Sequence, residues 1–559
     1  MRRKTEYFLF IFVLFILPIF PQSSVDSLEF IYPEKPVNIL STSFDKQLNT
    51  YSLNTGLIFN KTFGEFNFNI LENFNSKFVK TGQNNIRDDQ RFSLLSSYNL
   101  TEKIRLGISA ESRILSDDRT IEINQASISN ASLFTLYTPQ PGLSFSPFAG
   151  YSNNRQIGEN DYGFLYGIEG SANELEISDF HLTSQLKFRN DDISPRRNLI
   201  RYLGLIIDNN FDKDVANIFS ARFTQNRKDF YYKADQQTAE DFNITNNIQR
   251  RNETGYLVED KIRFGNFFDI FTLDALGKVT WREIDKDTRY KPSVNSTSVF
   301  DTRINELRIE FESNISYYSD FFSGGLRAIV SERDEKNITK NYEGSNLFDF
   351  EERSRQESQK NNNSTRASIA FYGNFNFSRT DKLSFSLLQN KLRYDTPSGE
   401  NFDDRDEILS IFRLRYSKLL TPFFETFVNA EGTYSHIVYL YSEKSSNNNI
   451  NRVLKFASGG NYFGKNVSSS NTFEVSANYT VYDFEDLNPN YKSFSFRQFT
   501  AIDSSNITIF KNFYFNAYGY LKLSEQGDFK WNSFSERPTR FLEEIYGEPK
   551  LTVNIRGIL

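Results

Sequence analysis

Apolar and polar side chains alternate along Phe271–Arg282, and the same pattern recurs through most of the chain. Successive side chains of a β-strand point to opposite faces, so the alternation predicts a strand with one apolar and one polar face. A strand of similar character precedes it, and Gly265-Asn266 predicts a tight turn between the two. One face carries Phe271, Leu273, Ala275, Gly277, Val279 and Trp281, and the other carries Thr272, Asp274, Leu276, Lys278, Thr280 and Arg282. These features, with aromatic residues near the turn, are typical of a hairpin in a membrane β-barrel.

The charged face of each predicted strand is expected to line a lumen, and the apolar face is expected to contact lipid. The predicted lumen-lining residues are Asp274, Lys278, Arg282, Glu306, Arg308, Glu310, Glu312, Arg327, Glu425 and Glu474. The predicted lipid-facing residues are Leu273, Val279, Leu307, Ile309, Phe311, Val475 and Phe515. Carboxylates and arginines are mixed on the lumen side, so they are expected to pair with one another, and no ion selectivity is predicted.

Short and long connections alternate between the predicted strands. Short turns are predicted at Asn60–Gly64, Thr101–Lys103, Pro139–Pro141, Asn173-Glu174, Asp212–Asp214, Gly265-Asn266, Ser319-Asp320, Arg379–Asp381, Leu420–Pro422, Gly464–Asn466 and Lys511-Asn512. Long polar loops are predicted at Thr81–Asp89, Asn153–Asn160, Asn190–Asn198, Lys233–Asn252, Asp285–Thr302, Asp334–Asn363, Thr396–Arg405, Ser442–Asn451 and Glu485–Lys492. Outer-membrane barrels have short periplasmic turns and longer extracellular loops, whereas soluble sandwiches do not separate their loops in this way. The sequence therefore predicts an all-β fold, a transmembrane antiparallel up-and-down β-barrel of about 22–24 strands.

The hairpin sequences NLTEKIRLGIS, NFSRTDKLSFSLL and LSFSPFAGY resemble those of large bacterial outer-membrane β-barrels, the class of porins and of TonB-dependent transporter barrels. The resemblance covers the chain from Thr50 onward and lies in the hairpin pattern, not in a motif of one family. It implies contact with outer-membrane lipid and insertion by the barrel-assembly machinery. The residues before Thr50 are too few for the plug domain of a TonB-dependent transporter, so energised uptake by that mechanism is not expected.

The first residues predict export from the cytoplasm. Residues 1–22 have a basic start and an apolar run that is too short for a transmembrane helix, as in a signal peptide. We expect residues 23–49 to be a periplasmic lead and residues 50–559 to form the barrel in the outer membrane. In the tail, Arg540–Tyr546 has a helix-like pattern. The last predicted strand stops at Leu559 without the usual terminal aromatic residue, so it is either atypical or truncated.

Composition excludes several other classes of protein. Aromatic residues make up 16% of the chain, which argues against disorder. The net charge is −6, and the basic residues do not cluster into the stripe that a nucleic-acid-binding protein needs. The chain has no cysteine, which rules out disulfides, thiol catalysis and thiol-bound cofactors.

No residue pattern supports catalysis, a cofactor or a metal. The chain has two histidines, of which His181 is interpreted as a polar lining residue and His436, beside Ser435, as an interfacial residue. An outer-membrane hydrolase would need a third orienting group beside such a serine–histidine pair. The loop carboxylates Asp403, Asp404 and Asp406 lack the register of a calcium loop. The chain is therefore not expected to be an enzyme.

The longest predicted loop, Asp334–Asn363, carries many charges around the apolar segment Leu347–Phe350. A loop of this length is uncommon without a function or disorder. Because Leu347, Phe348 and Phe350 favour burial, we expect the loop to fold back over or into the barrel mouth. Folded inward, it would narrow the opening as a constriction.

The function predicted from these observations is a passive pore or channel for solutes. The alternative is a structural or scaffold barrel of a secretion or surface-attachment assembly, whose lumen is filled by a periplasmic or surface partner or by its own loops. An embedded hydrolase is a distant third possibility.

Overall fold

The computed structural model describes residues 38–553, except 81–83, 118–125, 235, 237–239, 241–245, 292–300, 341–346 and 489. The predicted signal peptide and the last residues of the chain lie outside this part. The described residues form 24 strands, β1 (Ile39–Gln47), β2 (Thr50–Phe63), β3 (Phe66–Lys80), β4 (Asn84–Asn99), β5 (Ile104–Asp117), β6 (Ala126–Gln140), β7 (Leu143–Gln156), β8 (Glu159–Ile177), β9 (Phe180–Ser194), β10 (Asn198–Asp212), β11 (Val215–Lys233), β12 (Asn246–Phe267), β13 (Phe271–Lys291), β14 (Thr302–Tyr318), β15 (Phe322–Thr339), β16 (Asn362–Asn376), β17 (Asp381–Asp395), β18 (Arg405–Thr421), β19 (Phe424–Tyr439), β20 (Asn449–Phe463), β21 (Val467–Tyr482), β22 (Phe494–Phe510), β23 (Phe513–Lys530) and β24 (Ser535–Val553).

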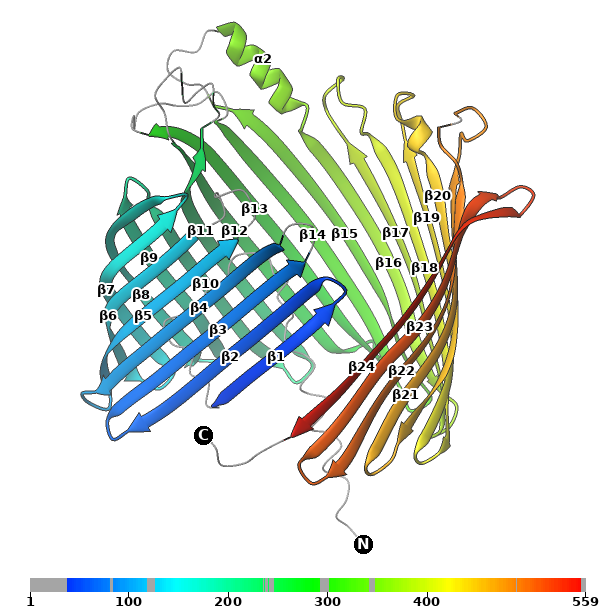
Figure 1. Cartoon of the computed structure of the whole chain (residues 1–559), viewed down its shortest axis with the longest axis horizontal. Helices are drawn as coiled ribbons and strands as arrows, with labels where there is room; N and C mark the ends of the chain where they lie inside the picture. The colour runs from blue at the N-terminus through cyan, green and yellow to red at the C-terminus, as the bar shows by residue number, and fades with distance from the viewer. Residues whose placement is uncertain are drawn as a thin grey trace.

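Each strand pairs antiparallel with the next one along the chain, so the sheet is a continuous up-and-down meander. In Figure 1 the sheet rolls around a central space, with the short helix α2 (Leu347–Ser358) above one wall. The predicted all-β, up-and-down fold is confirmed, and the strand number falls within the predicted range. Among the described residues, no helix is long and apolar enough to cross a membrane.

The strands are longer than a bilayer requires. A transmembrane strand needs about 9–11 residues, whereas β12 has 22 residues and β13 has 21. Segments predicted as long loops are therefore partly strand, and Asn153–Asn160 contains only a tight turn at Ile157-Gly158. The polar extensions pair with each other through backbone hydrogen bonds, which need no apolar side chains.

Three predicted boundaries change. Gly265-Asn266 lies in a bulge at the end of β12, and the turn follows at residues 268–270. Asn173-Glu174 is likewise a bulge, and that turn lies at Ser178-Asp179. The sheet begins at Ile39, before the predicted start at Thr50.

The helix-like reading of Arg540–Tyr546 is wrong, because this segment lies inside β24. Its leucine and glutamates favour a helix in isolation, but pairing with β23 provides a ladder of backbone hydrogen bonds and decides the conformation.

The polar face of the sheet is its concave face. Arg189 on β9 lies 3.9 Å from Glu111 on β5, across three intervening strands. Such a contact is possible only on the inner side of a curved sheet. On the opposite face, large apolar side chains are exposed all around the sheet, including the predicted Val279, Leu307, Ile309, Phe311 and Val475. Leu273 and Phe515 share that face and are half-buried.

One junction in the sheet differs from all others. Among the described residues, no hydrogen-bonded pairing joins β1 to β24. Figure 1 shows these two edge strands facing each other across an opening in the front wall. We call this junction the seam.

Candidate functional site

The inner wall of the sheet carries the candidate functional site, and the strand register defines its members. Lys278 lies opposite Glu310, Arg282 opposite Glu306, and Asn314 opposite Arg327, so these side chains share one face. Following the register around the sheet puts all ten predicted lumen-lining residues on this same inner face. That water fills the space they surround stays a prediction.

On β12–β15 the inner charges alternate in sign and pair across strands. Arg282 lies 3.3 Å from Glu253 and 3.8 Å from Glu306, which also lies 3.1 Å from Arg333. Arg327 and Glu312 form a two-pronged pair at 2.7 and 2.8 Å. Because these groups are partly exposed, each pair contributes only about 0.2–1 kcal/mol to stability. Because charges of opposite sign lie side by side, the inner wall is locally charged but produces little net electrostatic field in the lumen.

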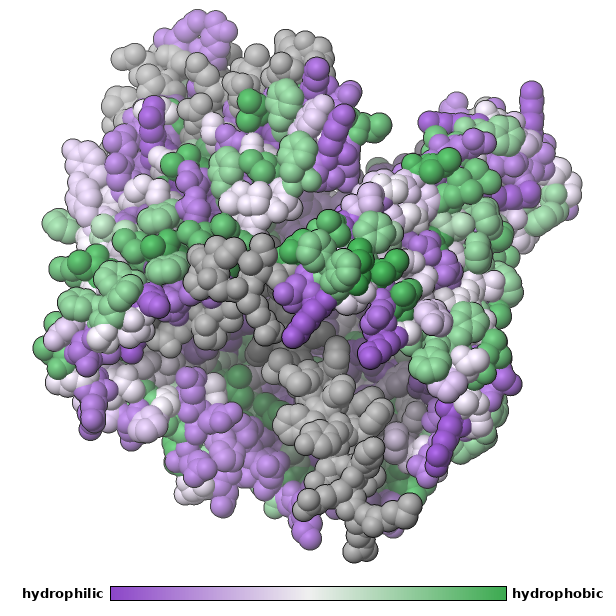
Figure 2. All heavy atoms as spheres, turned by 60° about the horizontal axis from the view of Figure 1, so that its bottom comes forward, coloured by the Kyte–Doolittle hydropathy of each residue, from purple (hydrophilic) through white to green (hydrophobic). Residues whose placement is uncertain are grey.

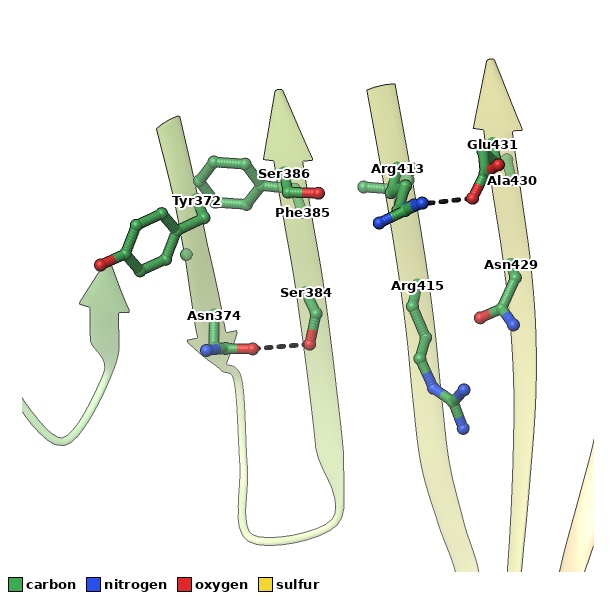
Figure 3. A pocket seen from close by; sticks show the side chains of 12 residues that line it. Tyr372, Asn374, Ser384, Phe385, Ser386, Arg413, Arg415, Asn429, Ala430 and Glu431 are labelled. Atoms are coloured by element: carbon green, nitrogen blue, oxygen red, sulfur yellow. Dashed lines mark hydrogen bonds and ion pairs between the residues drawn. The ribbon is translucent and has the colours of Figure 1, made fainter. Parts of the chain in front are cut away.

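On β16–β19 the wall is hollowed into a basin of about 410 Å³, lined by both polar and apolar groups. In Figure 3, Arg413 faces Glu431 at 2.6 Å, and the Ser384 hydroxyl donates to Asn374 Oδ1 at 2.6 Å. The mixed charges of the inner wall predict that Arg413 and Arg415 both pair with carboxylates, and Arg413 does so. Arg415 differs, because its guanidinium lies over the Phe427 ring with 4.2 Å to the centroid.

Between β4 and β11 the sheet bends tightly and encloses a second cavity of about 560 Å³. Nearby, Lys187 and Glu169 form a buried ion pair at 2.7 Å. Arg189 reaches Asp191 at 2.9 Å as well as Glu111. Removing one partner of a buried pair is costly because the other charge is left unpaired. This corner is therefore a rigid part of the barrel, whereas the other walls are more open.

Arg196 closes the top of this corner, and no sequence pattern around it indicates this role. Only 2% of the residue is exposed. Its guanidinium donates to Asp161 at 2.5 Å, to Gln156 at 2.9 Å and to the Asn154 carbonyl at 2.8 Å, and it lies over the Tyr231 ring.

The geometry around Arg196 follows from strand lengths. The β9–β10 connection at residues 195–197 lies between the taller strands β8 and β11. Above it, the Tyr231 amide donates to Gln156 Oε1 at 2.9 Å, and Asn246 donates to Glu159 at 2.8 Å. Arg196 therefore fills the space above the short β9–β10 hairpin and beneath the ends of β8 and β11, which extend past it.

The described part of the predicted constriction loop does not fold into the barrel. Leu347–Phe350 forms the first turn of α2, where Leu347 and Phe348 are 71% and 76% exposed. The helix is fixed to the neighbouring connection, since Arg355 pairs with Glu400 at 3.3 Å. Figure 1 places α2 above the strand ends and not inside the barrel. The helix orders twelve residues of this loop, so the apolar segment need not fold inward to be ordered.

The histidines give no catalytic arrangement. His436 Nε2 lies 2.9 Å from Asp483, but Ser435 is the next residue along the strand and so points to the opposite face. The two cannot act as a nucleophile and its base. Among the described residues, no group of three or more potential metal ligands comes together.

Two rows of aromatic rings mark the outer face at different heights. Near the short turns, Phe322 and Phe375 lie with ring centroids 4.8 Å apart. Toward the long loops, Phe223, Tyr256 and Trp281 follow one another at 5.1 and 5.2 Å. On β13 the rows are ten residues apart (271 to 281), about 33 Å along the strand and about 25 Å after a tilt of about 40°. That height matches the apolar band of a membrane barrel. The fold is that of a large membrane-type β-barrel.

No protein-family model matches the sequence, and no curated protein matches it. Solved structures with a similar arrangement include the ferric-catecholate import receptor Fiu from E. coli K12, at 9% identity and TM-score 0.44 over 92% of this chain and 82% of that one. They also include the siderophore receptor PiuA from Acinetobacter baumannii, at 10% identity and TM-score 0.43 over 93% and 82%. The ferric citrate transporter FecA is 10% identical, with TM-score 0.43 over 89% and 75%. Likenesses this weak carry no argument about function.

Proposed function

We propose that the protein is an outer-membrane β-barrel transporter that lets polar solutes cross passively through its lumen. The observation that carries the proposal is the pairing of a charged, ion-paired inner wall with an apolar outer face bounded by two aromatic rows. A barrel of this width is too wide to be filled by its own wall side chains, so it leaves room for water or for a partner.

Solvent exposure of the inner charges favours a pore over a filled scaffold. Arg308, Arg327 and Arg413 keep about half of their side-chain surface exposed although each is ion-paired. A tightly packed partner would have to bury these charges at a cost of several kcal/mol per ion. The mixed signs argue against strong selection by charge.

The proposal is tested by reconstituting the purified barrel in planar bilayers and measuring single-channel current. Large, stable steps that scale with salt concentration are expected, and liposomes holding the barrel should swell in small sugars. Silent bilayers with a folded barrel would refute the pore and favour the scaffold alternative. In the cell, the proposed surroundings are outer-membrane lipid and, during insertion, the barrel-assembly machinery.

We also propose that the barrel is not a hydrolase, because Ser435 and His436 point to opposite faces of β19. Incubation of the barrel with phospholipid vesicles should release no fatty acid.

A further inference from the structure

The seam between β1 and β24 carries an inference beyond passage through the lumen. A sheet edge presents a row of unpaired N–H and C=O groups, and in hydrocarbon each unsatisfied group costs several kcal/mol. Both edges at the seam are exposed along nearly their whole length. In a bilayer the edges must therefore meet for most of the time.

The lengths of the two edge strands fit such a meeting. Pairing of β24 with β23 places Ile545 beside Leu521 and Leu551 beside Phe515 on the apolar outer face. The membrane part of β24 is thus residues 543–553. Strand β1 has nine residues, which can pair with nine of these eleven positions but not with the upper half of β24. In Figure 1 the β23–β24 turn accordingly stands far above the β1–β2 turn.

One antiparallel register of the two edges can be tested directly. Its central pair is Asp45 on β1 and Tyr546 on β24, which lie near enough to each other to interact electrostatically. Both residues lie on the inner face, as the register through β2 and β23 requires. Antiparallel pairing centred there would place Ser43 opposite Glu548 and Ser41 opposite Lys550.

The seam is nevertheless the weakest junction of the sheet. It offers at most nine residue pairs, whereas β12 and β13 are matched over nearly their whole lengths. Pro538 and Pro549 on β24 have no N–H to donate, and proline in sheets is confined to edges. Charged residues that protect an edge from other strands are also dense on β24, namely Glu536, Arg537, Arg540, Glu543, Glu544, Glu548 and Lys550. A barrel built in this way opens at the seam before it opens elsewhere.

The two sides of the seam differ in chemistry. By outer and inner lips we mean the outer and inner faces of the two edge strands. The outer lips are apolar, with Phe44 on β1 and Ile545 on β24 strongly exposed. The inner lips are polar and aromatic. There the rings of Tyr520 and Tyr546 stack at 5.2 Å, the Tyr520 hydroxyl donates to Glu544, and Lys522 lies over the Tyr520 ring. A molecule bridging the open seam would touch polar groups at one end and hydrocarbon at the other.

We propose that the seam is a lateral portal between the lumen and the bilayer for an amphipathic molecule with a polar head and an acyl chain. Strands β1 and β24 pair to close it and separate to open it. The proposal rests on the proposed membrane location but does not require that the barrel conduct, so the two can fail separately.

The first test asks whether the edges meet. The chain has no cysteine, so Asp45→Cys with Tyr546→Cys introduces a single possible disulfide. In membranes, mild oxidation should join the pair, as it should join the control pair Ser43→Cys with Asn54→Cys on the neighbouring strands β1 and β2. If the control pair forms and neither the seam pair nor Ser43→Cys with Glu548→Cys does, the edges do not meet and the proposal is wrong.

The second test asks whether lipid reaches the inner lips. Trp281 and Trp531, the two tryptophans, are replaced by phenylalanine, and Tyr518→Trp places one reporter beside the seam. The matched control is Ser386→Trp on β17, on the inner face of the basin wall. In vesicles of dibromostearoyl-phosphatidylcholine, the bromine atoms should quench Tyr518→Trp more strongly than Ser386→Trp.

Locking the seam decides the interpretation. Oxidising the Asp45→Cys/Tyr546→Cys pair should abolish the extra quenching at the Tyr518→Trp reporter, and reduction should restore it. The portal proposal would be wrong if both reporters were quenched equally, or if oxidising the cysteine pair left the quenching of Tyr518→Trp unchanged. A silent barrel that still shows lock-dependent quenching would refute the pore and leave the portal standing.

Discussion

Placing a charge on the outer face should be more damaging than removing one from the inner face. Ile309 and Arg308 are neighbours on β14 that point to opposite sides. Ile309 is 50% exposed and lies opposite Val279, two residues from Trp281 in the upper aromatic row. An arginine facing lipid costs about 2–4 kcal/mol at the midplane and about 0–1 kcal/mol at the interface, so Ile309→Arg, between these depths, should cost about 1–2 kcal/mol. Arg308→Ile removes one partly exposed pair with Glu310 and should cost less than about 1 kcal/mol.

The measurement is urea unfolding of both variants in lipid vesicles, followed by tryptophan fluorescence and protease resistance. A difference of about 1 kcal/mol corresponds to a change of about fivefold in the unfolding equilibrium. Ile309→Val controls for loss of side-chain volume alone and should stay close to the unmodified protein. If Arg308→Ile is as damaging as Ile309→Arg, the assignment of inner and outer faces is wrong.

Three further outcomes are expected. Deleting Leu347–Phe350 should leave single-channel conductance unchanged, because α2 stands outside the lumen, and a rise in conductance would restore the constriction model. Arg196→Met should destabilise the barrel by about 3–5 kcal/mol in urea unfolding, because Asp161 would be left buried without its partner, whereas the more exposed Arg197→Met should change little. Glu431→Gln should shift the reversal potential in a salt gradient toward anions, because Arg413 loses its counter-charge in the basin, and an unchanged potential would exclude the basin from the ion path.

Face and strand order could be predicted from the sequence because the membrane imposes them locally. Within the bilayer each outward residue must be apolar, so a two-residue period such as Leu307, Ile309 and Phe311 fixes the orientation of a whole strand. The short turns were placed well for a related reason, since Lys511-Asn512 or Gly464–Asn466 interrupts an otherwise regular alternation.

Outside the bilayer this constraint disappears, and the predictions failed there. The start of β12, NNIQRRN, is polar on both faces apart from Ile248 and belongs to the predicted loop Lys233–Asn252, although it continues the strand. Alternation cannot reveal a strand that has water on both sides. The predicted burial of Leu347–Phe350 is also wrong. A short apolar segment does not by itself indicate whether it is buried or lies exposed in a surface helix.

The Arg196 cluster could not have been predicted because it depends on differences between strand lengths. Asp161 and Tyr231 are separated from Arg196 by 35 residues in each direction, and they meet only because β8 and β11 rise past the β9–β10 hairpin. In the sequence, Arg196 is one of two adjacent arginines in a charged loop, and its neighbour Arg197 is half-buried.

The distribution of rigid and weak regions around the barrel gives these features a common physical basis. The corner from β4 to β11 is fixed by buried charges such as Lys187 and Glu169, which lose their partners if the strands separate. The seam between β1 and β24 has no such pairs in the described structure, and its longest possible ladder is nine residues. A closed sheet transmits strain around its circumference, so any deformation is concentrated where separation costs least. Because the corner from β4 to β11 is rigid, separation costs least at the seam. The inner wall between the corner and the seam can keep its ion pairs while the seam opens.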